Sequence, residues 1–264
     1  MSYNFQDLLV AYSVLGVKKG SVVHVTGDLM LLMKYEVPGK ETVLEAHRDA
    51  LFELTGGEGT LVVPAHSFYL CNTDKSFDVD KTHGMNGVLP ESIRQLPEAL
   101  RSFHPFASYA AIGPRAEEIC NDISHHGYGP ETPMARLIEM NALSIHIGLL
   151  PRMSSSIVHH VEMQMGVPYR YSKEFVHPVV RRNKINKEPF YLYVHYKECD
   201  IKRDRNVKIF NDYEEEHTVN QVKVGRGFIY SYSMKDFYYS MVNTLRKDIY
   251  SWLNTPPEVR PYQK

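Results

Sequence analysis

Hydroxyl, imidazole and carboxylate side chains stand close together between Ser155 and Glu162. His159 and Glu162 are three positions apart, so they share one face if the segment is helical. A carboxylate beside a histidine fixes the tautomer of the imidazole and stabilises the imidazolium, which makes the pair a candidate general base. Serines that cap an ordinary helix, with histidines that are buried or hydrated, would give the same pattern. The spacing by itself leaves both interpretations open.

A second polar cluster runs from Arg101 to Ser108 and reads Arg-Ser-Phe-His-Pro-Phe-Ala-Ser. Guanidinium, hydroxyl and imidazole donors in a loop that contains proline could bind the phosphates or polar amides of a cofactor. An ordinary surface loop has the same composition. Both interpretations therefore stay open for this cluster as well.

Common nucleotide and metal motifs are absent from the sequence. It contains no GxGxxG turn, no P-loop, no HExxH and no paired CxxC. The three cysteines, Cys71, Cys120 and Cys199, are far apart and show no metal-ligand spacing. We therefore expect no bound metal, and three free thiols in a reducing compartment.

An acidic run, Asp-Tyr-Glu-Glu-Glu, occupies residues 212–216. Such a run could attract a cationic amino sugar, although most charge runs are hydrated surface. Basic residues stand close by in the sequence, at Lys202, Arg203, Arg205 and Lys208. Because basic groups repel further ammonium charges, this mixture favours a ligand with one amine over a polycation.

Charge and composition exclude several classes of protein. Thirty basic and thirty-one acidic residues leave a formal charge of −1, whereas proteins that bind nucleic acid or anionic membrane surfaces carry a basic excess. The N-terminus has no basic region ahead of an apolar run, and no apolar stretch approaches the roughly 20 residues that a membrane span needs. We therefore expect a cytoplasmic protein with no nucleic-acid partner and no membrane partner.

Strands and helices alternate along the first 165 residues. This alternation predicts an α/β fold, with a mostly parallel central sheet flanked by helices. Short apolar runs and helical spacing of apolar residues place the elements as follows. The predicted strands are 21–26, 60–65, 108–113 and 142–148, and the predicted helices are 5–15, 41–54, one from about 90, 114–123, 133–140, 156–165 and, near the end, 234–253.

The helix that carries His159 follows the predicted strand that ends at Gly148. Open α/β sheets bind ligands beyond the carboxyl ends of their parallel strands, so this helix is well placed for a site. The segment from His66 to Asn86 has little periodicity, and long ordered loops are often functional. From Pro178 onward the alternation predicts antiparallel strands. We expect a single domain over residues 1–264, with an antiparallel insertion at about 178–230 in its C-terminal third.

Several segments, in order, resemble the aminoglycoside 3-N-acetyltransferase family. Residues 101–113 keep every fixed position of its Arg-Ser-x-His-Pro-x-x-Ser-x-Ala-x-x-Gly element. The family's Asn-Thr-x-x-His-x-x-Glu element is represented by Ser155, Ser156, His159 and Glu162. Further similar segments are Gly16 to Gly20, Asp28-Leu29, Gly59 to Pro64, Thr132 to Leu137 and Glu198-Cys199-Asp200, so the resemblance runs from about residue 5 to residue 253.

The resemblance implies a coenzyme-A-dependent N-acyltransferase without a metal. Acetyl-CoA or another acyl-CoA would be the co-substrate, and a small-molecule amine would be the acceptor. His159 becomes the general base, with Glu162 and Glu198 as candidate partners. The candidates for the coenzyme side are Asp28, Leu29, Ser102, His104, Ser108 and Ser156.

The sequence departs from the family pattern at two places. Thr26-Gly27 replaces His-Ser, and Ser155-Ser156 replaces Asn-Thr. Both places lie where donor or acceptor is bound, so we expect an amino sugar other than a resistance drug as acceptor. An aminoglycoside resistance enzyme and a non-catalytic ligand-binding member of the fold are the alternatives, and a homodimer is left open. We expect direct transfer of the acyl group, because two carboxylates beside Cys199 would raise the pKa of its thiol.

Overall fold

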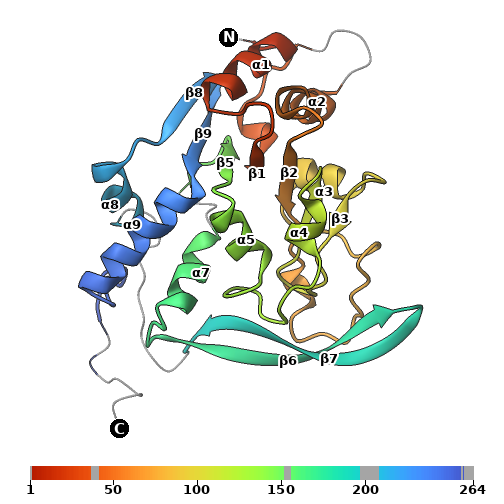
Figure 1. The fold of residues 1–264 in the computed structure, drawn as a ribbon, viewed down its shortest axis with the longest axis vertical. Helices are drawn as coiled ribbons and strands as arrows, with labels where there is room; N and C mark the ends of the chain where they lie inside the picture. Colours follow the sequence, from red (N-terminus) through yellow and green to blue (C-terminus); the bar gives the residue numbers. More distant parts are fainter. Residues whose placement is uncertain (1, 37–41, 152–155, 197–207, 257, 259–264) are drawn as a thin grey trace.

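The computed structural model describes residues 2–36, 42–151, 156–196, 208–256 and 258. A seven-stranded sheet with helices on both faces forms its body, and a separate two-stranded hairpin lies across one end (Figure 1). The strands are β1 (Val22–Gly27), β2 (Thr60–Pro64), β3 (Leu100–Arg101), β4 (Tyr109–Ile112), β5 (Leu143–Ile147), β6 (Arg170–Arg181), β7 (Lys184–His195), β8 (Asn220–Val224) and β9 (Gly227–Ser233).

Helices connect most of these strands, as the alternating pattern predicts. The α-helices are α1 (Phe5–Val14), α2 (Val43–Thr55), α3 (Val88–Arg94), α4 (Ala116–Cys120), α5 (Pro133–Glu139), α7 (Ile157–Gln164), α8 (Lys208–Glu216) and α9 (Met234–Lys247), and two short 3-10 helices are η1 (Leu29–Leu31) and η2 (Phe68–Leu70). Side-chain caps begin several of them. Asn4 and Thr42 each form a capping box, and Thr132 caps α5 with Pro133 at its first position.

Helix α9 ends earlier than the sequence pattern predicts. The apolar periodicity continues to Leu253, but the helix stops at Lys247 because Asp248 has an extended backbone. Tyr250, Trp252 and Leu253 are nevertheless buried. Apolar residues after the helix therefore pack against the core as a turn, and periodicity alone cannot distinguish this from one more helical turn.

The sheet is mixed, and this corrects the expectation of a mostly parallel one. Its strand order is β3-β4-β2-β1-β5-β9-β8, and only the central strands β2, β1 and β5 are parallel neighbours. Strand β4 lies antiparallel to β2, and β9 lies antiparallel to β5. The α/β class and the helices on both faces are as expected.

The reversed strands have the same cause on both sides of the sheet. Strand β3 runs in the direction of β2, but the loop after it turns back, and β4 inserts between the two. Likewise, β8 runs in the direction of β5, and the tight turn at Gly225 sends β9 back between them. A hairpin ends the sheet at each edge. Strand β3 has two residues, which is too short for a period-2 pattern to reveal.

The two faces of the sheet have different cores. Val23, Val25 and Ile145 point toward α1, α2 and α3, where the buried residues of the three central strands are apolar. The alternate positions point toward α4, α5, α7 and α9, and here polar residues appear among the apolar ones. His24 and Ser144 on this second face pair directly across β1 and β5.

The hairpin β6–β7 pairs all twelve positions of each strand. Its turn residues Arg182 and Asn183 both have positive φ, 50° and 62°, as a two-residue primed turn requires. A small apolar cluster attaches it to the body, with Phe77 and Phe106 packed against Val179. We expect an antiparallel insertion at residues 178–230. This range contains part of the hairpin, then α8 and then β8, and β8 belongs to the central sheet.

Candidate active site

Helix α7 follows β5 in the chain and carries His159, which lies near His66 just after the end of β2. His159 is the third residue of this eight-residue helix, and its side chain is 30% exposed. The ring of Tyr128 lies beside it, with centroids 5.2 Å apart. A partly exposed imidazole next to a buried phenol can exchange protons with a ligand while one side of the ring is held in place.

Glu162 lies one turn further along the same face of α7 and is fully buried. Its Oε2 is 3.6 Å from Nδ1 of His159 and 2.8 Å from Nε of Arg170. Both contacts are ion pairs rather than hydrogen bonds, and the guanidinium is the nearer of the two partners. The carboxylate is therefore held mainly by Arg170 and faces the imidazole as a second, weaker partner.

Arg170 is the residue that sequence reasoning missed. It begins β6, its side chain is 3% exposed, and its Nη1 donates to the carbonyl oxygen of Tyr193 at 2.8 Å. An arginine beside a buried carboxylate offsets the cost of removing that charge from water. No helical spacing links positions 162 and 170, because a turn and a strand start lie between them. The pairing arises from the tertiary fold.

Two phenols surround this ion pair. Burial raises the pKa of Tyr193 to about 12, and the negative charge of Glu162 adds to the effect. Burial also raises the pKa of Tyr128 well above its usual range. Both phenols therefore stay protonated near neutral pH. Tyr193 donates its hydroxyl to the carbonyl oxygen of Val167 at 3.0 Å and thereby fixes the turn between α7 and β6.

His160, the neighbour of His159, has a different environment. It is 2% exposed, and its Nδ1 accepts the backbone N–H of Gly129 at 3.2 Å. Burial lowers its pKa to about 4, so it is neutral near pH 7. Consecutive residues on a helix point about 100° apart. One histidine consequently faces the ion pair, and the other is part of the core.

The segment from Arg101 to Ser108 is buried rather than arranged as a surface loop. Ser102, His104 and Ser108 are at most 1% exposed. Ser102 Oγ accepts the backbone N–H of Tyr109, and Ser108 Oγ donates to the carbonyl oxygen of Ala65. The hydrogen bonds of Ser102 and Ser108 are thus made within the chain, and contact of these two side chains and of His104 with a coenzyme stays a prediction.

His104 shows why the segment needs polar residues. Its Nδ1 accepts the backbone N–H groups of Phe106 and Ala107, at 3.1 and 3.0 Å. Burial lowers the pKa of His104 to about 3, so the ring is neutral and Nδ1 can accept. The imidazole closes the loop between β3 and β4. This loop is the one that makes β4 antiparallel.

Arg101 attaches the same hairpin to the long segment after β2. Its guanidinium donates to the carbonyl oxygens of Ala65, Val79 and Thr82 and lies over the ring of Phe77. Burial lowers the pKa of this guanidinium to about 10. The segment 66–86 is thus held in place by backbone contacts, although it contains only one short 3-10 helix.

Asp28 and Leu29 lie just beyond β1, beside the end of β5. Asp28 is exposed and caps η1, and Leu29 is 6% exposed. The preceding residue, Gly27, has φ of 138°, and a Cβ there would stand 2.1 Å from the carbonyl oxygen of Ile147. Only glycine allows this close approach. The departure from His-Ser at Thr26-Gly27 therefore follows a local backbone requirement.

Ser156 precedes the first residue of α7, and its Oγ is 3.2 Å from the hydroxyl of Tyr109. It makes no side-chain cap to the helix. The other two predicted residues of this region, Ser155 and Glu198, lie outside the residues that the structure describes.

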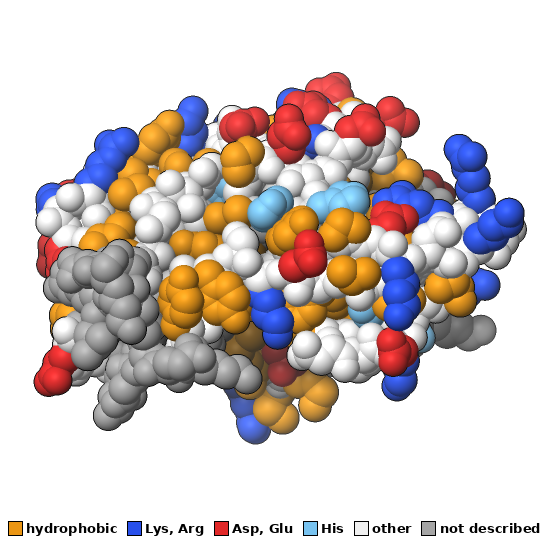
Figure 2. Space-filling model, turned by 90° about the horizontal axis from the view of Figure 1, so that it is seen from below, with side chains coloured by type: hydrophobic (Ala, Val, Ile, Leu, Met, Phe, Trp, Pro, Cys, Tyr) orange, Lys and Arg blue, Asp and Glu red, His pale blue; other side chains and the backbone are white. Residues whose placement is uncertain are grey.

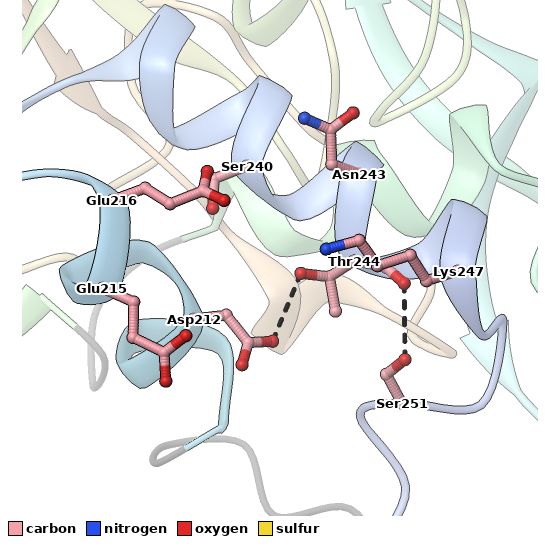
Figure 3. A pocket seen from close by; sticks show the side chains of 8 residues that line it. All are labelled: Asp212, Glu215, Glu216, Ser240, Asn243, Thr244, Lys247 and Ser251. Carbon is pink, nitrogen blue, oxygen red and sulfur yellow. Dashed lines mark hydrogen bonds between the residues drawn. The ribbon is translucent and has the colours of Figure 1, made fainter.

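Two surface hollows occur away from this cluster. One, of about 400 Å³, lies between α8 and α9 and contains the acidic side chains of Asp212, Glu215 and Glu216 (Figure 3). Lys247 and Thr244 line its opposite side, and Thr244 bonds to Asp212 at 3.2 Å. The other, of about 590 Å³, lies between α1 and β8. Both hollows are lined by residues other than the His-Glu pair of α7.

Figure 2 shows the molecule from below, relative to the view of Figure 1. On this face, histidine side chains reach the surface among hydrophobic ones. Within the described part of the chain, no three His, Cys, Asp or Glu residues are grouped so that they could hold a metal ion. The cysteines described there, Cys71 and Cys120, are free thiols. None of the described helices is long and apolar enough to cross a membrane.

The mixed sheet, the hairpin and the His-Glu pair after β5 define an α/β fold with a candidate general-base site. The family model described as "Aminoglycoside 3-N-acetyltransferase" matches residues 32–246. The chain belongs to this family, which confirms the resemblance seen in its motifs.

Individual relatives agree with this assignment. Aminoglycoside N(3)-acetyltransferase IX of Micromonospora chalcea is 33% identical over 181 residues, and the match covers 61% of each chain. Aminoglycoside N(3)-acetyltransferase VIII of Streptomyces fradiae is 29% identical over 193 residues, with 62% of each chain covered. The chain thus spans about three fifths of the length of these relatives.

Solved structures share the fold over nearly the whole chain. The apoenzyme of aminoglycoside acetyltransferase AAC(3)-IVa has a TM-score of 0.78 at 23% identity, covering 97% of this chain and 93% of its own. The structure named "AAC-IIIb binary with CoASH" has a TM-score of 0.80 at 20% identity, covering 97% and 100%. The YokD protein of Bacillus subtilis has a TM-score of 0.80 at 20% identity, covering 94% and 95%.

Proposed function

We propose that this protein is a coenzyme-A-dependent N-acyltransferase in which His159 is the general base. One observation supports this above the others. A partly exposed imidazole stands beside a buried carboxylate that an arginine holds in place. This arrangement lies where α/β sheets bind ligands, in a chain of the aminoglycoside 3-N-acetyltransferase family.

The proposed reaction is a direct transfer. An aliphatic amine is mostly protonated at neutral pH and cannot attack a thioester until it loses a proton. His159 accepts that proton and releases it to solvent, and the neutral amine nitrogen then bonds to the thioester carbonyl carbon. His159 takes the second proton, which the nitrogen loses as the amide forms, and the carbon–sulfur bond breaks. The imidazolium then returns the proton to the departing thiolate. Glu162 stabilises the imidazolium through Nδ1, which leaves Nε2 to face the amine.

Negative charge develops on the thioester oxygen during the attack and needs a hydrogen-bond donor. Among the coenzyme-side candidates, Ser108 is fully buried and already donates to the carbonyl oxygen of Ala65. Ser156 is only partly buried and stands at the start of the helix that carries His159. Because the Ser156 hydroxyl already contacts the hydroxyl of Tyr109, we assign this role to a backbone N–H near Ser156. Asp28, which is exposed beyond β1, stays the proposed coenzyme contact from that strand.

The proposed acceptor is the amine of an amino sugar, with aminoglycosides as the first compounds to test. Relatives and neighbours carry the names of aminoglycoside acetyltransferases, and solved structures contain a gentamicin, sisomicin and apramycin. The charge argument for a mono-amino acceptor rests on residues outside the His-Glu pair. Asp212, Glu215 and Glu216 surround the hollow between α8 and α9, and Lys202, Arg203 and Arg205 lie outside the described residues.

Three further expectations belong to the same proposal. Glu198 is a second carboxylate near the base, the protein acts in the cytoplasm, and a single domain contains the whole site. A homodimer is an open outcome of the same measurements.

Calorimetry with acetyl-CoA in the presence of a chelator is the first test. We expect heat of binding without any metal, and release of free thiol when an amine is added from a panel that contains gentamicin, sisomicin, apramycin and glucosamine. His159→Asn is the matched control, which should keep the heat and lose the thiol release. If acetyl-CoA produces neither heat nor a thermal shift, the protein is not an acyl-CoA enzyme.

A further inference from the structure

Tyr109 joins the sheet to the helix that carries His159. It begins β4 and is fully buried on the second face of the sheet. Two imidazoles lie against its ring. The ring centroid of His66 is 5.2 Å away in an edge-to-face arrangement, and that of His24 is 6.0 Å away. The ring position of Tyr109 is therefore set by residues from β1 and from the segment after β2.

The hydroxyl of Tyr109 contacts Ser156 Oγ at 3.2 Å. Burial raises the pKa of Tyr109 far above its usual range, so the phenol keeps its proton near neutral pH. Ser156 makes no side-chain cap to α7. Its hydroxyl is used instead to attach the start of the helix to the sheet.

The two imidazoles that hold Tyr109 are themselves held in place. His24 Nδ1 on β1 contacts Ser144 Oγ on the neighbouring strand β5 at 3.1 Å. Ser144 Oγ also contacts His146 Nε2 on the same strand at 2.9 Å. The backbone N–H of His66 donates to Asn86 Oδ1 at 2.7 Å. Burial lowers the pKa of His24 to about 4. Burial, and then the charge of nearby histidines that include His159, lowers the pKa of His66 to about 3.

The short helix α7 makes this attachment important. It has eight residues, and His159 is in its first turn. Ends of short helices fray, because their first N–H groups lack partners within the helix. A base displaced by about 1 Å can reduce turnover by about 10²-fold. Whatever holds the first turn therefore controls the direction of the imidazole.

We infer that Tyr109 is a positioning residue, which directs His159 by holding Ser156 and the first turn of α7 through its hydroxyl. This inference rests on the proposed acyl transfer for its kinetic consequence. Its structural consequence, a first turn of α7 held by one phenol, can be measured without any substrate.

The test compares Tyr109→Phe with Tyr12→Phe. Each change removes one hydroxyl from a fully buried ring, since Tyr12 bonds to His47 Nδ1 at 2.6 Å in the opposite core. Both variants should lose stability. Only Tyr109→Phe should lower kcat, by about tenfold or more, with KM for acetyl-CoA unchanged. Only it should speed hydrogen exchange of the backbone amides of residues 156–162, by about fivefold.

A double-mutant cycle between Tyr109 and Ser156 provides a second test. Ser156→Ala should lower kcat as Tyr109→Phe does, and the double variant should lose little more than either single one. Ser156→Thr keeps the hydroxyl and should retain more turnover than Ser156→Ala. Additive losses, or a rise in KM for acetyl-CoA with kcat intact, would overturn the inference and favour direct contact of Ser156 with the coenzyme.

Hydrogen exchange separates this inference from the proposed function. Should the unmodified protein acylate none of the amines tested, faster exchange in Tyr109→Phe alone would still support the structural role. Equal exchange in Tyr109→Phe, Tyr12→Phe and the unmodified protein would refute it, even in an active enzyme.

Discussion

Residues 101–108 and 156–162 contain the same kinds of polar side chain but use them differently. In the first segment Ser102, His104 and Ser108 bond to backbone groups and are at most 1% exposed. In the second, His159 keeps a side chain that is 30% exposed beside a buried ion pair. A buried polar residue whose hydrogen bonds close a loop acts on structure. One that keeps an accessible atom next to a buried charge can act on a ligand.

The largest expected effect concerns residues 156–162. His159→Ala should lower turnover by about 10²–10⁴-fold, which is the usual contribution of general acid–base catalysis. Thiol release at saturating acetyl-CoA measures it, and binding of acetyl-CoA should change little.

His160→Ala is the control for this prediction. Its ring is buried against Tyr238, so the change should lower stability and leave turnover per folded molecule within about threefold. The opposite order of the two effects would show that the register through α7 is wrong.

The next largest effect concerns the ion pair between Glu162 and Arg170. Glu162→Gln leaves the guanidinium of Arg170 buried without its counter-charge, so the free energy of unfolding should fall by about 3–5 kcal/mol. Urea unfolding measures this loss. Glu188→Gln removes a carboxylate from a more exposed pair with Arg181 and should cost about 1 kcal/mol or less. Similar losses from the two variants would mean that the Glu162 pair is hydrated in solution.

Substitutions in residues 101–108 should lower the stability of the protein rather than its catalytic rate. His104→Ala removes the acceptor for two buried N–H groups and leaves a cavity, at a cost of about 2–4 kcal/mol in the free energy of unfolding. Turnover and acetyl-CoA affinity of the folded fraction should stay within about threefold. Loss of coenzyme affinity at unchanged stability would instead restore the expectation that His104 contacts the coenzyme.

The smallest expected effect is a pH dependence of stability from the same residue. Burial lowers the pKa of His104 to about 3 in the folded protein, against about 6.5 in an unfolded chain. The unfolded state therefore binds an extra proton between about pH 6.5 and 3. The contribution of the neutral ring is complete above about pH 6.5 and is lost as the pH falls.

His104→Gln provides the measurement of this slope, because glutamine can accept a hydrogen bond but does not titrate. Between pH 7 and pH 5.5 its stability should fall less than that of the unmodified protein, by about 1.3 kcal/mol. Urea unfolding at both values checks this. Equal slopes would place the folded-state pKa of His104 near its unperturbed value and contradict its burial as a neutral ring.

The sequence alone determined most of the helices and strands of the first 165 residues and which two residues form the His-Glu pair. Such features depend on contacts between near neighbours, such as the continuous apolar runs of β1 and β2 or the three-residue spacing of His159 and Glu162. The family resemblance added the role of His159. These contacts do not change when distant parts of the chain move.

The tertiary structure alone decided the directions of the outer strands, the burial of Ser102, His104 and Ser108, and the pairing of Glu162 with Arg170. A two-residue strand such as β3 has no period to detect. Whether a histidine is a ligand contact or a loop closure depends on what covers it, and here Phe106 and the hairpin β6–β7 cover His104. The physical reason is that burial and long-range pairing are set by residues far apart in the chain, for which no local spacing encodes a partner.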